Sequence, residues 1–158
     1  MDDVTVARAL HILAVVVWIG GVSMVTTVLL PMVPGLESSD RTRIFEAIER
    51  RFSRQARLSV MLAGLTGFYM LIRLDAWGRF ASLSYWWMHA MVLVWLIFAG
   101  ILFVAEPLSL SRRFGARVPA RPGDALRLMA RLHWGLLILS VLTILGAVAG
   151  SHGAWFFG

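Results

Sequence analysis

The sequence predicts an all-α integral membrane protein, a four-helix bundle whose second helix extends into the cytoplasm. Of its 158 residues 59% are hydrophobic, and the mean hydropathy is +0.77. A soluble domain is closer to half apolar. Three uncharged runs each exceed the roughly 20 residues that cross a bilayer. These runs are 9–36, 82–105 and 132–158. A fourth uncharged run, 58–72, is shorter. Arg57 and Arg73 at its two ends can still belong to the span, because their charged ends can reach the lipid headgroups.

Each expected span ends where charge or proline returns, and together the spans form a single transmembrane domain. The spans are about 4–33, 55–74, 84–105 and 125–150. Pro31 and Pro34 end the first span, because proline cannot continue the hydrogen bonding of a helix. Glu106 and Pro107 end the third.

The second span is expected to belong to one continuous helix of about 40–74. Between residues 41 and 57 apolar side chains recur at helical spacing among charges, and no glycine or proline separates this stretch from the apolar run that follows. At 1.5 Å per residue such a helix is about 50 Å long, which exceeds the bilayer core. Its first half is therefore expected to project from the membrane.

All 15 basic residues are arginine, and their distribution predicts the orientation. The second loop carries only Arg73 and Arg79, and the N-terminus only Arg8. The first and third loops and the helix that follows carry Arg41, Arg43, Arg50, Arg51, Arg54, Arg57, Arg112, Arg113, Arg117, Arg121, Arg127 and Arg131. The positive-inside rule places these two loops in the cytoplasm, so both termini face the periplasm of a bacterial inner membrane. We therefore interpret the net charge of +6 as arginines that determine the topology and contact membrane lipid, and not as a sign of nucleic-acid binding.

The absence of cysteine limits the cofactor chemistry. It excludes disulfides, thiolate metal sites, c-type haem attachment and iron–sulfur clusters. Histidine is then the candidate ligand. His11, His89 and His133 lie well inside apolar stretches, where an ionisable side chain is costly and is usually kept for a function.

His11 and His89 are expected at the same depth near the periplasmic face. His11 lies seven residues inside its span and His89 five, which at 1.5 Å per residue places both roughly 8–10 Å deep. Imidazole is a common axial ligand of haem iron, and four-helix bundles often hold cofactors between facing helices. We therefore predict that His11 and His89 are the ligands of haem b, or of a metal such as copper.

Four further residues are expected around this cofactor. Arg8 precedes His11 by one turn and Arg73 lies at the same surface, so both can bind haem propionates. Trp18 lies two turns below His11 on the same face, and Trp86 lies one turn above His89. These indoles would supply the aromatic walls that a haem requires.

The remaining histidines and a small-residue motif have structural interpretations. His133 is expected to hydrogen-bond near the cytoplasmic interface, and His152 to be exposed at the outer surface, where copper or a proton could bind. Gly146 and Gly150 form a G-x-x-x-G motif, which indicates close helix packing within the bundle or in a homodimer.

Two other functions stay open at this point. Copper uptake or tolerance would combine the histidines with some of the eight methionines, because copper(I) prefers soft sulfur ligands. A non-catalytic scaffold subunit would use its histidines only for hydrogen bonds between helices.

Several short motifs resemble those of a known group. ALHILA (9–14) and VWIGG (17–21) resemble the first span of the CopD-like membrane proteins and their HemJ-type relatives. RFSR (51–54) and GLTG (64–67) are similar to the start of their second long helix, and WMHAM (87–91) resembles the third-span histidine motif of the HemJ proteins.

The resemblance implies a bundle in the cytoplasmic membrane. For HemJ it implies b-type haem bound through His11 and His89 and the oxidation of protoporphyrinogen, and the CopD name implies copper handling. Met91 stands where HemJ proteins usually have lysine, and Leu-Pro-Met at 30–32 replaces their Pro-Arg pair, so we carry over the haem site and not that reaction. We expect electron transfer, or haem-linked oxidation of a membrane-soluble substrate such as a quinol, with a quinone or a redox partner. Whether the chain is an enzyme stays open.

Overall fold

The computed structural model describes residues 2–32, 35, 38–105 and 122–153, with the backbone alone for 38–46, 48–49 and 122–126. Predictions about Pro34, Glu106, Pro107 and the arginines of the third loop before residue 122 lie outside these residues.

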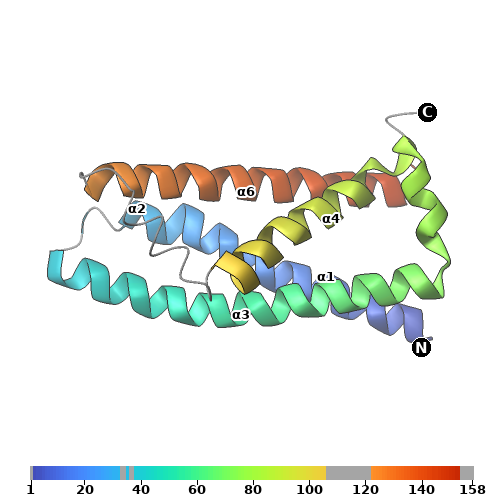
Figure 1. Ribbon diagram of the computed structural model, residues 1–158, viewed down its shortest axis with the longest axis horizontal. Helices are drawn as coiled ribbons and strands as arrows, with labels where there is room; N and C mark the ends of the chain where they lie inside the picture. The colour runs from blue at the N-terminus through green and yellow to red at the C-terminus, as the bar shows by residue number, and fades with distance from the viewer. Residues whose placement is uncertain (1, 33–34, 36–37, 106–121, 154–158) are drawn as a thin grey trace.

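The described chain is almost entirely helical, which confirms the all-α prediction (Figure 1). No strand occurs within residues 2–32, 35, 38–105 and 122–153. In chain order the elements are α1 (Asp3–Met24), the π-helix η1 (Val25–Leu29), α2 (Leu30–Met32), α3 (Ser38–Arg73), the 3-10 helices η3 (Ala76–Ala81) and η4 (Leu83–Tyr85), α4 (Trp86–Ala99), the π-helix η5 (Gly100–Ala105) and α6 (Pro122–Ser151).

Four helical stretches are long and apolar enough to cross a membrane, as expected for an integral membrane protein. They are Asp3–Met32, Arg50–Arg73, Leu83–Ala105 and Arg127–Ser151. The second is the apolar part of α3, which is a single helix of 36 residues. This confirms the continuous helix expected over about 40–74, whose first turns precede the apolar part.

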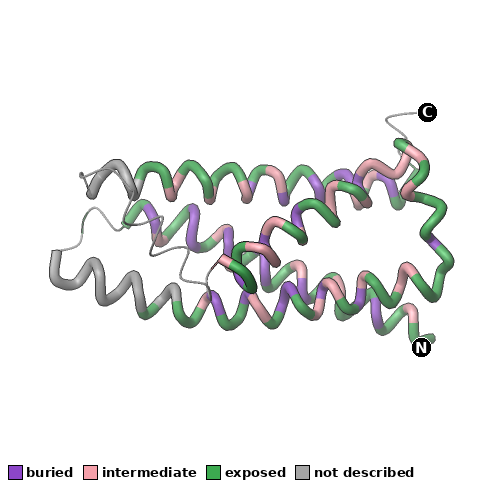
Figure 2. Tube along the Cα trace, viewed as in Figure 1, coloured by how far each residue is buried: buried purple, intermediate pink, exposed green. Residues whose placement is uncertain are grey.

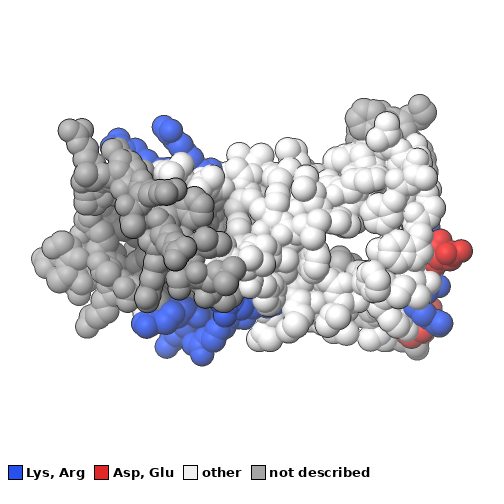
Figure 3. All heavy atoms as spheres, in the orientation of Figure 1, with Lys and Arg blue, Asp and Glu red and all other residues white. Residues whose placement is uncertain are grey.

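The helices form two closely packed antiparallel pairs, α1 with α3 and α4 with α6. Smaller contacts join α3 to α4 and α1 to α6, so that α1 and α4 lie diagonally across the bundle. We call the end at which α1 begins and α6 ends the termini end. The opposite end is called the arginine-rich end, because arginines gather there (Figure 3). Its described arginines are Arg50, Arg51, Arg54, Arg57, Arg127 and Arg131.

The core lies where all four helices approach one another. The rings of Trp18 and Phe98 meet edge to face with centroids 4.8 Å apart, and Val60 of α3 is completely buried beside them. Figure 2 shows buried positions along the faces where helices meet and exposed positions around the outside. The outside is rich in large apolar side chains such as Val16 and Leu65, which are 61% and 66% exposed. A surface this apolar is suited to lipid and not to water.

Polar groups appear where the spans begin and end. Asp2 caps α1 by accepting a 2.6 Å hydrogen bond from the backbone N–H of Thr5. Hydrogen bonds from Thr5 hold the pKa of Asp2 below its ordinary value, so the carboxylate stays charged at neutral pH. After α3 the chain turns through Asp75, whose φ of 45° is a left-handed conformation that aspartate tolerates better than most residues.

Glycines of α3 and α6 receive aromatic rings of α4. A methyl group added at Gly64 would overlap Trp95, and one added at Gly146 or Gly150 would overlap Trp86 or Trp87, respectively. The G-x-x-x-G motif of α6 is therefore filled by two tryptophans of α4 within one chain. This is the packing within the bundle that the motif predicted, whereas its role in a homodimer stays a prediction.

Filling one of these glycine positions is expected to destabilise the α4–α6 pair. Gly146→Leu forces the Trp86 ring out of its place and should lower the unfolding free energy by about 1–3 kcal/mol, the usual cost of overpacking. Gly135→Leu on the same helix is the matched control, because nothing lies within 4 Å of an added Cβ there. Thermal unfolding in detergent measures both variants, and equal midpoints would contradict this account of the packing.

Candidate functional site

His11 is bound to the neighbouring helix α3 through its Nδ1 atom. Nδ1 lies 2.9 Å from the carbonyl oxygen of Ala63 and 3.1 Å from Oγ1 of Thr66. The hydroxyl of Thr66 donates its own proton to the carbonyl of Leu62 at 2.7 Å, so its oxygen is available as an acceptor. Both partners of Nδ1 are therefore acceptors, and Nδ1 must carry the proton. A neutral imidazole of this tautomer has an unprotonated Nε2.

The sequence of the two helices explains why the ring fits here. Gly67 lacks a side chain, and a Cβ there would come within 3.2 Å of Cε1 of His11. Ala7 and Ala14 of α1 are buried one turn away on either side, which lets α1 approach α3 closely. Nε2 makes no hydrogen bond to any residue that the structure describes.

His89, in the first turn of α4, is bound to the connection that precedes its helix. Its Nε2 lies 3.1 Å from the carbonyl oxygen of Phe80, and the two rings meet edge to face with centroids 5.3 Å apart. Nε2 therefore donates its proton to this carbonyl. His89 can offer Nε2 to a metal only after its ring turns and leaves Phe80.

Counting along the helices compares the depths of the two histidines. Trp95 packs at Gly64 of α3, and His11 packs at Gly67, three residues nearer the termini end. His89 lies six residues from Trp95 in the same direction. At 1.5 Å per residue the two imidazoles differ in depth by about 4–5 Å, less than one helical turn. Within the part of the chain that the structure describes, no contact joins the two rings.

The two predicted tryptophans lie in different parts of the bundle. Trp18 is in the core against Phe98, whereas Trp86 packs on α6 at Gly146. Both have a buried indole Nε1 that finds no acceptor among the described residues. An unsatisfied N–H in an apolar region costs free energy, so an acceptor supplied by a ligand would stabilise either position.

The two predicted arginines also have different surroundings. Arg8 is an exposed residue of α1, one turn from His11. Arg73 pairs with Asp3 at 2.8 Å, and the hydroxyl of Tyr69 donates to the same carboxylate at 2.7 Å. Asp3 and Tyr69 were not among the residues singled out from the sequence. The ion pair could have been predicted from position, because Asp3 begins one span and Arg73 ends the adjacent antiparallel span.

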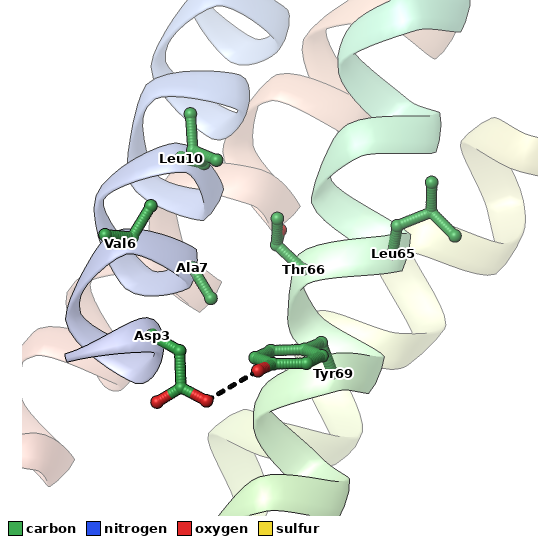
Figure 4. Close-up of a pocket in the computed structure, with 7 residues that line it drawn as sticks. All are labelled: Asp3, Val6, Ala7, Leu10, Leu65, Thr66 and Tyr69. Carbon is green, nitrogen blue, oxygen red and sulfur yellow. Dashed lines mark hydrogen bonds between the residues drawn. The ribbon is translucent and has the colours of Figure 1, made fainter.

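A groove between α1 and α3 is lined in part by Thr66, a hydrogen-bond partner of His11. Its volume is about 360 Å³, and its walls are mostly apolar. Figure 4 shows the lining residues, which are Asp3, Val6, Ala7, Leu10, Leu65, Thr66 and Tyr69. Thr66 both lines the groove and accepts the hydrogen bond from His11. A molecule in the groove would therefore touch the residue that orients the imidazole.

The other two histidines are bound to their own helix. Nδ1 of His133 lies 3.0 Å from the carbonyl of Met129, and Nδ1 of His152 lies 2.8 Å from that of Val148. His152 is exposed, as expected. No group of three or more histidine, cysteine, aspartate or glutamate side chains that could hold a metal ion occurs in the described parts of the chain.

Comparison with known proteins found no matching family model, no matching curated protein and no matching solved structure.

The tautomer of His11 can be tested directly. In protein labelled with 15N at its four histidines, His11 should show a protonated Nδ1 and an unprotonated Nε2. Thr66→Val should shift only the His11 signals and lower the unfolding free energy by about 1 kcal/mol, the net value of one hydrogen bond. Thr143→Val is the control, because Thr143 donates only to its own helix. A His11 ring protonated at Nε2 would contradict the assignment.

Proposed function

We propose that this chain is a haem-b-binding membrane protein in which His11 and His89 would hold the haem iron. The observation that carries the proposal is the hydrogen bonding of His11. A histidine that ligates a metal through one nitrogen usually donates its other N–H to a carbonyl or similar acceptor, which sets the tautomer and orients the ring. Ala63 and Thr66 supply those acceptors to Nδ1. Nε2 is left unprotonated, with a lone pair that could bind a metal.

The other residues fit a haem to different degrees. His89 lies at nearly the depth of His11. To bind a metal through Nε2 it would have to give up its hydrogen bond to the backbone carbonyl of Phe80. Arg8 is free to bind a propionate, whereas Arg73 would share its charge between a propionate and Asp3. The indoles of Trp18 and Trp86 pack elsewhere, against Phe98 in the core and at Gly146 of α6, respectively.

The bound haem would supply one-electron exchange, and the protein would control which molecules reach it. Two histidine ligands leave no open coordination position, which favours electron transfer over oxygen binding. The groove of about 360 Å³ beside Thr66 is open toward the bilayer and has Asp3 and Tyr69 among its lining residues. It suits a lipid-soluble substrate of the quinol class, whose hydroxyl groups the carboxylate of Asp3 could accept from.

We also propose the placement and relationship that the sequence suggested. The chain would lie in a bacterial inner membrane with its termini in the periplasm, because arginines gather at the opposite end of the bundle (Figure 3). Membership of the CopD-like and HemJ-like group rests on the short motifs around His11 and His89. Copper in place of haem is the alternative, with His11 and His89 among its ligands.

The optical spectrum tests the haem proposal. Protein purified in detergent after haem supplementation should show a Soret band that shifts on reduction with dithionite. His11→Ala and His89→Ala should each abolish the band, and Thr66→Val should lower haem affinity by about 10-fold, as expected for loss of a residue that orients a ligand.

The remaining histidines provide matched controls. His133→Ala and His152→Ala should leave the band unchanged, because each ring is bound only to its own helix. A colourless protein with near-stoichiometric copper in elemental analysis would favour copper handling. A colourless, metal-free protein whose His11→Gln variant folds normally would overturn both and leave a scaffold role.

A further inference from the structure

A second groove opens between α1 and α3 near the arginine-rich end, away from the histidines. Its volume is about 220 Å³. It is lined by Gly21, Met24, Val25, Leu29, Arg51, Phe52 and Gln55. Five of the seven are apolar, and the arginine and the glutamine are neighbours on α3. The groove therefore combines an apolar interior with a polar edge.

The shape of this groove follows from local features of the two helices. Gly21 has no side chain, and the ring of Phe52 packs in the space that a Cβ would fill. α1 changes to a π-helix at Val25, which widens the turn there. Gln55 donates to the carbonyl of Val17 at 3.4 Å and so closes the groove toward the middle of the bundle. Met24 is 53% exposed and forms the wall on the lipid side.

Positive charge is concentrated along the polar edge. Arg51 lines the groove, and Arg54 lies three residues further along the same face of α3. Nε of Arg54 donates to the carbonyl of Arg50 at 3.3 Å, which holds this guanidinium beside its neighbours. No described side chain forms an ion pair with these three arginines. Residues 41–57 carry six arginines against two glutamates, so the edge has a clear excess of positive charge.

We propose that this groove binds an anionic phospholipid, with an acyl chain against Met24 and Phe52 and the headgroup phosphate at Arg51 and Arg54. Guanidinium groups bind phosphate through charge-assisted, often bidentate hydrogen bonds. Basic pockets between transmembrane helices are typical sites for anionic headgroups. Arg50 begins the apolar stretch of α3, so the groove lies at the level where headgroups meet acyl chains.

The combination of walls and charge selects this occupant over others. A free phosphate ion would gain nothing from the apolar walls, and a zwitterionic lipid would bring an ammonium group close to the arginines. The site is independent of the haem proposal, because it shares no residue with the surroundings of His11 or His89.

Native mass spectrometry of the full chain in detergent tests the site. The protein is titrated with phosphatidylglycerol and with phosphatidylcholine of the same acyl chains, and phosphatidylglycerol should bind roughly 25-fold more tightly, from about 1 kcal/mol for each of the two arginines. At about 1 kcal/mol per arginine, Arg51→Gln should reduce this preference about fivefold, and the double variant with Arg54→Gln about 25-fold. Arg51→Lys should keep most of the preference, because it keeps the charge.

Two controls separate the charge from the groove. Arg131→Gln removes a charge at the same end on α6, outside the groove, and should leave the preference unchanged. Met24→Ala should weaken both lipids by a similar factor, because it removes the apolar wall and no charge. Circular dichroism confirms that each variant is folded.

Three results would overturn the proposal. The first is equal binding of the two lipids by the unmodified chain. The second is a reduction of the preference for phosphatidylglycerol by Arg131→Gln as large as that by Arg51→Gln, which would mean that the charge acts diffusely and not at the groove. The third is displacement of the lipid by millimolar inorganic phosphate, which would mean a free-anion site.

Discussion

Close packing must hold these helices together, because lipid tails are as apolar as the side chains and offer no advantage to burial as such. The structure meets this constraint with aromatic rings packed at glycines. Phe52 at Gly21 joins α1 to α3, Trp95 at Gly64 joins α3 to α4, and Trp86 at Gly146 joins α4 to α6. The sequential neighbours in the bundle are thus each joined by a large ring at a position where any side chain would collide with it. The indole N–H of Trp95 also donates to the carbonyl of Val60 at 2.8 Å, so one ring both packs and bonds.

His11 belongs to this set of contacts and adds a chemical requirement to it. Its ring packs at Gly67 as the other rings do at their glycines, but an imidazole in an apolar medium also needs a hydrogen-bond partner. The carbonyl of Ala63 and the hydroxyl of Thr66 satisfy Nδ1 and leave Nε2 without a described partner. His11 differs from His133 and His152 in that its Nδ1 is held by a neighbouring helix, whereas theirs are held by their own helix.

The spans could be predicted from the sequence because their signal is local: a run of apolar residues bounded by arginine or proline. The continuity of α3 over Ser38–Arg73 was predictable because apolar side chains recur at helical spacing over 41–57 and no glycine or proline separates them from the apolar run. Counting residues at a fixed rise places His11 and His89 within one helical turn of each other along the bundle, and their depth in a membrane stays a prediction. The direction in which each ring points does not follow from such counting, because it depends on which helix lies beside it. Trp86 was expected beside the haem, yet its place is set by Gly146, sixty residues away in the chain. Phe80, the partner of His89, lies in a connection whose course no periodic pattern predicts.

The contact between Trp18 and Phe98 limits where α1 and α4 could share a ligand. These rings meet at 4.8 Å in the core, so the two helices have no space between them at that level. Toward the termini end each helix keeps a different partner: α1 stays with α3 through His11, and α4 stays with α6 through Trp86 and Trp87. His11 lies seven residues above Trp18, about 10 Å along the axis. A planar ligand held by both histidines would have to lie between the Trp18–Phe98 pair and the termini end. The charged side chains near that end of α1 and α3 include Arg8 and the Asp3–Arg73 pair.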